Sequence, residues 1–178
     1  MLVAQRKKIG GYTALLSRLL YRVLSRLMPI CFNTLNVLLL GNLPPLGGTS
    51  VIVEDQERFL LIKHSGGVVA FPGGYIRWRE HPLQAAQREC REETGLNIAL
   101  QEAVGTYSHI GTGPMRVSTI NIVYAGKIAE GGTLRGSVEG QPVWMTEAEM
   151  RKAMDVRYSK LLEDYFAYRA RVEGELRR

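Results

Sequence analysis

Three glutamates, Glu89, Glu92 and Glu93, lie within five residues of one another in the stretch RECREETGL. On an α-helix, which turns by about 100° per residue, they share one arc of the surface. Like charges at this spacing repel each other, and acids near the C-terminal end of a helix oppose its dipole. Two interpretations are open: a solvated acidic face relieved by Arg88 and Arg91, or a site for a hard divalent cation, which prefers oxygen ligands.

Residues upstream of this cluster complete a longer pattern. Gly74 is followed by five residues and Glu80, and then by seven residues and RECREETGL. This arrangement resembles the Nudix box, G-x5-E-x7-R-E-U-x-E-E-x-G-U, in which U is a bulky aliphatic residue. One position departs from it, because Cys90 stands where the family usually has Leu, Ile or Val. The resemblance extends over roughly residues 48–165 and does not cover residues 1–45.

The resemblance implies a Nudix pyrophosphohydrolase, which cleaves a nucleoside diphosphate linked to another moiety by water attack at phosphorus. It implies a cofactor, Mg²⁺ or Mn²⁺, and a set of metal ligands: the backbone carbonyl of Gly73 with Glu89, Glu92 and Glu93. Glu89 would bind metal or act as the general base, Arg88 would orient it, and Glu80 would lie near the metals in an outer role. Such ions polarise the phosphates, lower the pKa of a bound water and stabilise charge on the leaving oxygen.

Residues outside the box are candidates for the remaining roles. By analogy with relatives that use an acid from a later loop, Glu139 is a candidate catalytic base or ligand, with Glu130 second. Arg77, Trp78 and Arg79 are the candidates for substrate binding, because two guanidinium groups and an aromatic ring suit phosphates and a base. The substrate itself stays open among nucleoside triphosphates, ADP-ribose and nucleotide sugars. Trp144 is expected to pack in the core.

Two other functions compete with the enzyme. A non-catalytic Nudix domain could sense a nucleotide and act through the N-terminal helix, but a sensor does not need the full set of carboxylates. An RNA-end pyrophosphohydrolase or RNA binder would use the basic N-terminus. The leucines there suit a membrane or a protein surface better than a phosphate backbone, which argues against a nucleic-acid partner.

The N-terminal segment carries the whole net charge of +6. Six of the 23 basic residues and none of the 17 acids precede Glu54, so the remainder is neutral. Residues 12–28 have helical periodicity, with an apolar face and arginines every four residues, and Pro29 is expected to end this helix. The segment could pack on the domain, form a homodimer, lie on an anionic membrane or act as a transit peptide. Arg22, Arg26 and Pro29 argue against a transmembrane span.

The remaining pattern predicts an α+β protein: a Nudix-type α/β/α sandwich with a mixed β-sheet, plus an N-terminal amphipathic helical extension. We expect strands at TSVIVED, RFLLIKH, NIALQEAVGTYSHI, RVSTINIVYAGKI and VEGQPVWMT, and at GGVVAFPGG a strand that ends in a glycine turn. Helices are expected at 82–93, with Leu83, Ala86 and Cys90 facing the core, and after a capping box at Thr146 and Glu149. Residues 1–45 form the extension and 46–178 the Nudix domain.

Two cysteines, Cys31 and Cys90, do not make a disulfide framework. The expected location is therefore cytoplasmic, with membrane association through residues 12–28 or organellar targeting as alternatives. A nucleotide-derived small molecule is the expected partner.

Overall fold

The computed structural model describes residues 19–20, 23–24, 26–64 and 66–176. Its contacts divide these residues into two units. Unit 1 consists of the described residues up to Pro45 together with Ile110–Ser118, and unit 2 of Leu46–His109 and Thr119 onward. Unit 2 holds the box and every strand in the described part of the chain.

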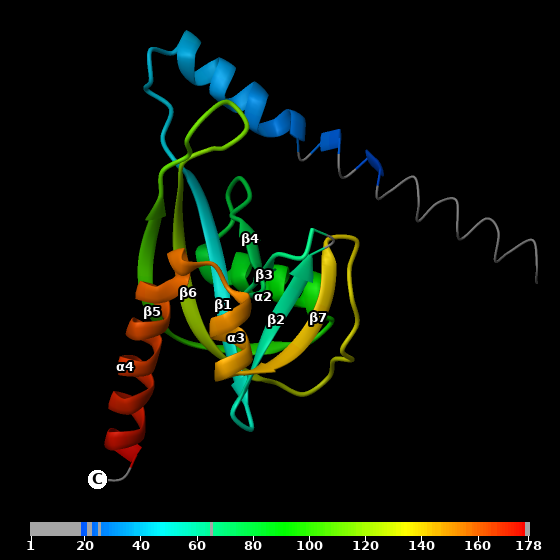
Figure 1. Cartoon of the computed structure of the whole chain (residues 1–178), viewed down its shortest axis with the longest axis vertical. Helices are drawn as coiled ribbons and strands as arrows, with labels where there is room; N and C mark the ends of the chain where they lie inside the picture. The colour runs from blue at the N-terminus through cyan, green and yellow to red at the C-terminus, as the bar shows by residue number, and fades with distance from the viewer. Residues whose placement is uncertain (1–18, 21–22, 25, 65, 177–178) are drawn as a thin grey trace, which may run out of the picture. The chain divides into compact units, whose positions relative to one another are not determined.

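A seven-stranded mixed sheet forms the centre of unit 2 (Figure 1). Its main path runs β3-β2-β1-β6-β5, in which β1 (Leu46–Asp55) pairs parallel with β6 (Thr119–Ile128) and antiparallel with β2 (Arg58–His64). β5 (Ile98–His109) pairs antiparallel with β6, and β7 (Gly140–Thr146) with β2. β3 (Val69–Ala70) pairs with β2, and β4 (Gly73–Tyr75) with the first half of β1. The long strand β1 therefore connects the glycines of the box to the sheet.

Helices cover both faces of this sheet, as Figure 1 shows. On one face, Ala86 and Cys90 of α2 (Pro82–Thr94) pack with Val51 and Leu60 from the strands. On the other, α3 (Glu147–Ala153) and α4 (Ser159–Leu176) contribute to a second apolar cluster; its helical members are Met150, Leu161, Leu162 and Tyr165, and Met154, directly after α3, also belongs to it. The predicted α/β/α sandwich with a mixed sheet is confirmed, and Trp144 packs at the edge of the first cluster as expected.

Helix α2 begins and ends where the sequence predicts. His81 is its N-cap and accepts a hydrogen bond from Leu83 N, while the Gln84 side chain accepts one from His81 N. Gly95 ends the helix in the left-handed conformation with φ 76°, which glycine adopts without a steric penalty. The predicted core face is wrong at one position, because Leu83 is 40% exposed and Ala85 is buried in its place.

Two other predicted elements differ from the structure. Gly73 and Gly74 form part of the short strand β4 and not a turn, since they pair with Ser50 and Thr49 of β1. The capping box at Thr146 and Glu149 is present, but the helix that it starts is not continuous. After α3, Met154 is extended and the Asp155 side chain caps a 3₁₀ turn, Val156–Tyr158, before α4 begins. A side chain that caps a new turn competes with continuation of the helix.

The described part of unit 1 contains a helix through residues 26–38, and residues 19–20 and 23–24 are also helical. The rest of the predicted helix at 12–28 lies outside the described residues. Pro29 does not end this helix: it is buried within it. Proline removes one backbone hydrogen bond towards the preceding turn but leaves the following residues free to be helical. None of the helices described in the structure is long and apolar enough to cross a membrane.

Candidate active site

Arg88 lies at the centre of the acidic cluster. Its Nε and Nη2 donate to the two carboxylate oxygens of Glu80 at 2.7 and 2.8 Å, and Nη1 contacts Glu89 and, at 3.4 Å, Glu92. Nη2 also donates to the carbonyl of Tyr75 at 3.1 Å. This single guanidinium thus connects the start of the box, the strand β4 and two of the three glutamates on α2. The hydrogen bonds from Arg88, followed by that from Arg77 N, lower the pKa of Glu80 to about 2.

Glu93 has a different environment from the other acids. It is 3% exposed, and its Oε2 accepts a hydrogen bond from Gly73 N at 2.8 Å. Burial raises the pKa of Glu93 to about 8; the Gly73 hydrogen bond opposes this shift, and the charges of Glu139 and Glu89 add to it. Glu139, a candidate from the sequence, therefore acts electrostatically on the box although it precedes β7. Glu130, the second candidate, is exposed, and its carbonyl accepts a bond from Asn97.

The paired glycines let the backbone of β4 approach these acids closely. A Cβ added to Gly74 would lie 2.6 Å from Cδ of Glu89 and 2.7 Å from both its oxygens. A Cβ on Gly73 would lie 2.2 Å from the carbonyl oxygen of Thr49. Any side chain at either position would therefore displace Glu89 or separate β4 from β1.

The donor chemistry of this region fits a hard divalent cation. Three carboxylates come from one helix, two of them, Glu89 and Glu93, lie against the backbone of Gly74 and Gly73, and the buried one has no basic side chain among the groups that shift its pKa. Such oxygen donors select Mg²⁺ or Mn²⁺ over softer metals. As the side chains of the described residues stand, no three acids converge closely enough to hold an ion. Glu92 is half-exposed and instead pairs with Arg77, whose Nη2 lies 3.2 Å from its Oε1.

A cavity of about 540 Å³ opens beside the two glycines in unit 2. Gly73, Gly74 and Tyr75 of β4 line one side of it, and Gly48–Ser50 of β1 lie along its floor. The ends of β2, β5 and β6 and the 3₁₀ turn supply most of the other lining side chains, among them His64, Tyr107, His109, Thr119, Asn121, Arg157 and Tyr158. The sheet therefore places this cavity next to the carboxylate cluster.

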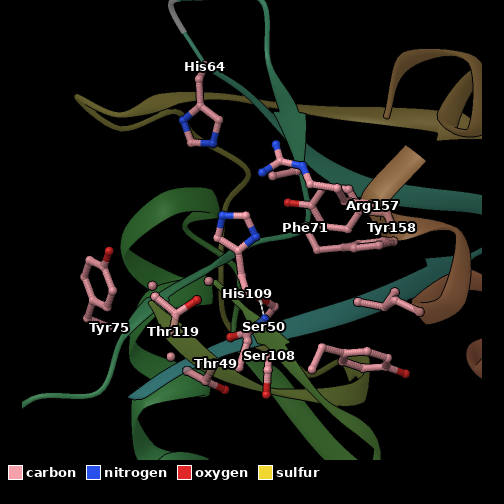
Figure 2. Close-up of a pocket in the computed structure, with 17 residues that line it drawn as sticks. Thr49, Ser50, His64, Phe71, Tyr75, Ser108, His109, Thr119, Arg157 and Tyr158 are labelled. Carbon is pink, nitrogen blue, oxygen red and sulfur yellow. Dashed lines mark hydrogen bonds between the residues drawn. The ribbon is translucent and has the colours of Figure 1, made fainter. Parts of the chain in front are cut away.

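The polar groups of this cavity are suited to an anion. Figure 2 shows the side chains of His64, His109 and Arg157 directed into the same space from three separate elements. His64 Nδ1 lies 3.1 Å from the Glu139 carbonyl, which fixes its ring. Asp155 holds the guanidinium of Arg157, with Nε 3.0 Å and Nη2 3.3 Å from its two oxygens. Among the described residues that line the cavity, none is acidic.

Aromatic rings form another part of the cavity wall. Phe71 and Tyr158 meet edge to face with ring centroids 6.5 Å apart, and Tyr75 and Tyr107 also line the cavity. Tyr107 donates to Asp164 Oδ2 at 3.0 Å. Burial, with this hydrogen bond next, raises the pKa of Tyr107, so its hydroxyl stays protonated. Flat apolar rings beside hydrogen-bonding groups are typical of pockets that bind small polar molecules.

The structure brings the predicted catalytic residues together but not the predicted substrate residues. Arg77 pairs with Glu92, Trp78 is 88% exposed, and none of Arg77, Trp78 and Arg79 lines the cavity. Arg79 instead stands over the Trp78 ring, 6.0 Å from its centroid. The sequence interpretation missed the cavity residues His64, His109 and Arg157. They are scattered along the chain, and only the pairing of strands shows that they meet.

The protein has helices on both faces of a mixed sheet and a glycine-containing strand against a glutamate-rich helix. Comparison with known proteins identifies the family that has these features. The model of the NUDIX domain matches residues 44–165. The chain belongs to the Nudix family, and the predicted enzyme class, a Nudix pyrophosphohydrolase, is confirmed.

Similar proteins include two named relatives and several solved structures. The chain is 28% identical to an ADP-ribose pyrophosphatase of Methanocaldococcus jannaschii over 131 residues, which cover 71% of this chain and 76% of the relative. It is 32% identical to a MutT-like protein of Streptomyces ambofaciens over 126 residues, covering 68% and 78%. A NUDIX hydrolase structure from Nitrosomonas europaea matches with a TM-score of 0.61 and 22% identity, covering 70% of this chain and 90% of that one. The similarity to the Nitrosomonas europaea structure shows a shared fold.

Proposed function

We propose that this Nudix protein hydrolyses the pyrophosphate bond of a nucleoside diphosphate linked to another moiety, of the ADP-ribose, nucleotide-sugar or nucleoside triphosphate type, with a divalent cation. The observation that carries the proposal is Glu93. It is a carboxylate buried to 3% exposure against Gly73, and its acidic neighbours Glu139 and Glu89 disfavour its charge. A cation bound there would remove this unfavourable interaction, and it would also attract the pyrophosphate that the acids alone repel.

The residues that would hold Mg²⁺ or Mn²⁺ are Glu89, Glu92 and Glu93 with the carbonyl of Gly73. When bound, the cation would neutralise charge on the phosphates and favour the ionised form of an attacking water. For Glu92 to take part, its carboxylate has to leave Arg77, to which it is bonded at 3.2 Å. Arg77, released from this ion pair, would then be free to contact a phosphate oxygen.

The chain's own groups would handle the proton. Water attacks one phosphorus, a new P–O bond forms, and the anhydride P–O bond breaks, with the electrons leaving on the departing phosphate. Glu89 or Glu139 would accept the proton of the attacking water. Arg88 holds Glu89 through Nη1 and is itself fixed by two bonds to Glu80, so it sets the position of the carboxylate and prevents its rotation. Such supporting contacts are worth about 10–100-fold in activity.

The cavity beside the glycines would receive the part of the substrate remote from the scissile bond. Its rings, from Phe71, Tyr75 and Tyr158, suit a base or sugar face, and Arg157 with His64 and His109 suits an anionic or carbonyl oxygen. The ADP-ribose pyrophosphatase among its relatives supports a substrate that carries groups on both sides of the pyrophosphate.

The test is product release from a panel of nucleoside diphosphate derivatives, with Mg²⁺, with Mn²⁺ and with a chelator. We expect hydrolysis of at least one panel member that stops on chelation and in Glu92→Gln and Glu93→Gln. Turnover that survives both substitutions would refute the assignment of the site. Tight nucleotide binding without hydrolysis by the metal-loaded protein would instead support the sensor function.

A further inference from the structure

Most large apolar side chains of the unit 1 helix at 26–38 are exposed to solvent, whereas its two asparagines are half-buried and bond to backbone groups. In the helix at 26–38, Asn33 Nδ2 donates to the carbonyls of Pro114 and Arg116 at 2.9 and 3.0 Å. Pro29 is buried, and Asn36 Oδ1 accepts a bond from Leu43 N. The large apolar residues are exposed, among them Leu27 (49%), Leu35 (48%), Val37 (75%) and Leu38 (73%). A helix that packs on a soluble domain normally has the opposite arrangement.

The loop that Asn33 binds extends the same apolar character. Ile110 is 77% and Met115 48% exposed. At the end of the helix, Leu40 has φ 55° and is 89% exposed, and Gly41 N closes the turn on Asn36 O at 2.8 Å. The left-handed conformation disfavours a leucine, and an asparagine or glycine there would be both relaxed and polar. An apolar side chain is therefore kept outward at a conformational cost.

Charge selects among the surfaces that could cover these residues. The sequence up to Pro45 has basic residues at 6, 7, 8, 18, 22 and 26, the loop at 110–118 adds Arg116, and neither segment contains an acid. A second copy of the chain would bring an equal positive charge to the same interface and be repelled by it. A nucleic acid would satisfy the charge but leave the leucines uncovered. An anionic lipid surface satisfies both, because it takes apolar side chains among its acyl chains and basic ones at its head groups.

We propose that unit 1 is a peripheral membrane-binding surface that recognises anionic phospholipid, with the exposed leucines and valines of residues 19–40 inserted at the interface. The helix at 26–38 lies on the bilayer and does not cross it. This proposal is independent of the hydrolytic reaction, since it uses no residue of the carboxylate cluster or the cavity.

The test is co-sedimentation of the full-length protein with phosphatidylcholine vesicles, with and without phosphatidylglycerol. We expect binding to the mixed vesicles that weakens with added salt, and little binding to phosphatidylcholine alone. Val37→Ser with Leu38→Ser should abolish it, whereas a matched valine and leucine of unit 2, Val68→Ser with Leu134→Ser, should not. The thermal melt of each variant, compared with wild type, reports whether the fold is intact.

The charge contribution has its own pair of variants. Arg26→Gln and Arg116→Gln should each lower the partition coefficient for the anionic vesicles by about fivefold. Lys127→Gln, an exposed lysine of unit 2, should leave it unchanged. Equal binding to both vesicle types, or none to either, would overturn the proposal. Self-association that V37S/L38S abolishes, seen by sedimentation velocity in the absence of vesicle binding, would assign the surface to a second copy.

Discussion

Glu80 and Glu93 belong to the same sequence pattern, but the protein stabilises the ionised form of Glu80 and destabilises that of Glu93. Glu80 receives two hydrogen bonds from Arg88 and one from Arg77 N, and its pKa falls to about 2. Glu93 is buried against a glycine with Glu89 and Glu139 nearby, and its pKa rises to about 8. The protein therefore neutralises one carboxylate itself and leaves the other to be neutralised from outside. The first kind of acid supports the site, and the second is available to a cation.

The largest effect is expected from removing the uncompensated acid. Glu93→Gln keeps the shape and can still accept the bond from Gly73 N, but it removes the charge that would hold the cation. We expect kcat/KM to fall on the order of 10³-fold, the scale observed when a group that stabilises transition-state charge is lost. Steady-state hydrolysis with saturating Mg²⁺ measures it. An activity within a few-fold of wild type would show that Glu93 does not serve the reaction.

Gly74→Ala tests whether the close approach of β4 matters to the acids. The added Cβ would overlap the Glu89 carboxylate, which must rotate away. A displacement of this size can cost about 10²-fold in rate when it moves a catalytic group. Gly66→Ala is the matched control, because a Cβ there meets nothing within 4 Å. Equal activity of the two variants would show that catalysis does not require a glycine at position 74.

Glu80→Gln changes the compensated acid. Arg88 loses its two charge-assisted bonds at 2.7 and 2.8 Å, and its hold on Glu89 should loosen. We expect activity to fall about 10–100-fold, as for other supporting contacts. The metal-free protein should also become less stable. Glu93→Gln should instead stabilise the metal-free protein, because it removes a carboxylate whose charge is disfavoured by burial. Thermal melts of both variants without metal measure the contrast, and shifts of the same sign would contradict it.

Much of this contrast could be predicted from the sequence, and the part that could not has a physical reason. The spacing from Gly74 to Gly95 is local, so the helix, its caps and the identity of the acids follow from it. The helical wheel places Glu92 and Glu93 on one arc, but it cannot tell which of them the sheet covers. His64, His109 and Arg157 meet only through the pairing of distant strands and a break after Met154. A single sequence contains no signal for such meetings.

The stability of the metal-free protein should depend on pH through Glu93. Its pKa is about 8 in the folded protein and near the ordinary value of 4.5 when unfolded. Between these values the folded form holds a proton that the unfolded chain has lost, so stability falls as pH rises across this window. Melting temperatures across this range without metal measure the slope. Added Mg²⁺ should raise the melting temperature most at the alkaline end, and Glu93→Gln should flatten the slope.

The smallest effect is expected at the cavity, where Asp155 compensates the positive charge of Arg157. Arg157 is held by Asp155, so it contacts substrate from a fixed position. Arg157→Gln should raise KM about tenfold with little change in kcat, the scale of one charge-assisted hydrogen bond. Arg58→Gln, at the opposite end of β2 from His64, is the matched control. If kcat falls and KM stays unchanged, Arg157 acts on the transition state. The acidic cluster would then not be the only reacting part, and the assignment of the cavity to substrate binding alone would be wrong.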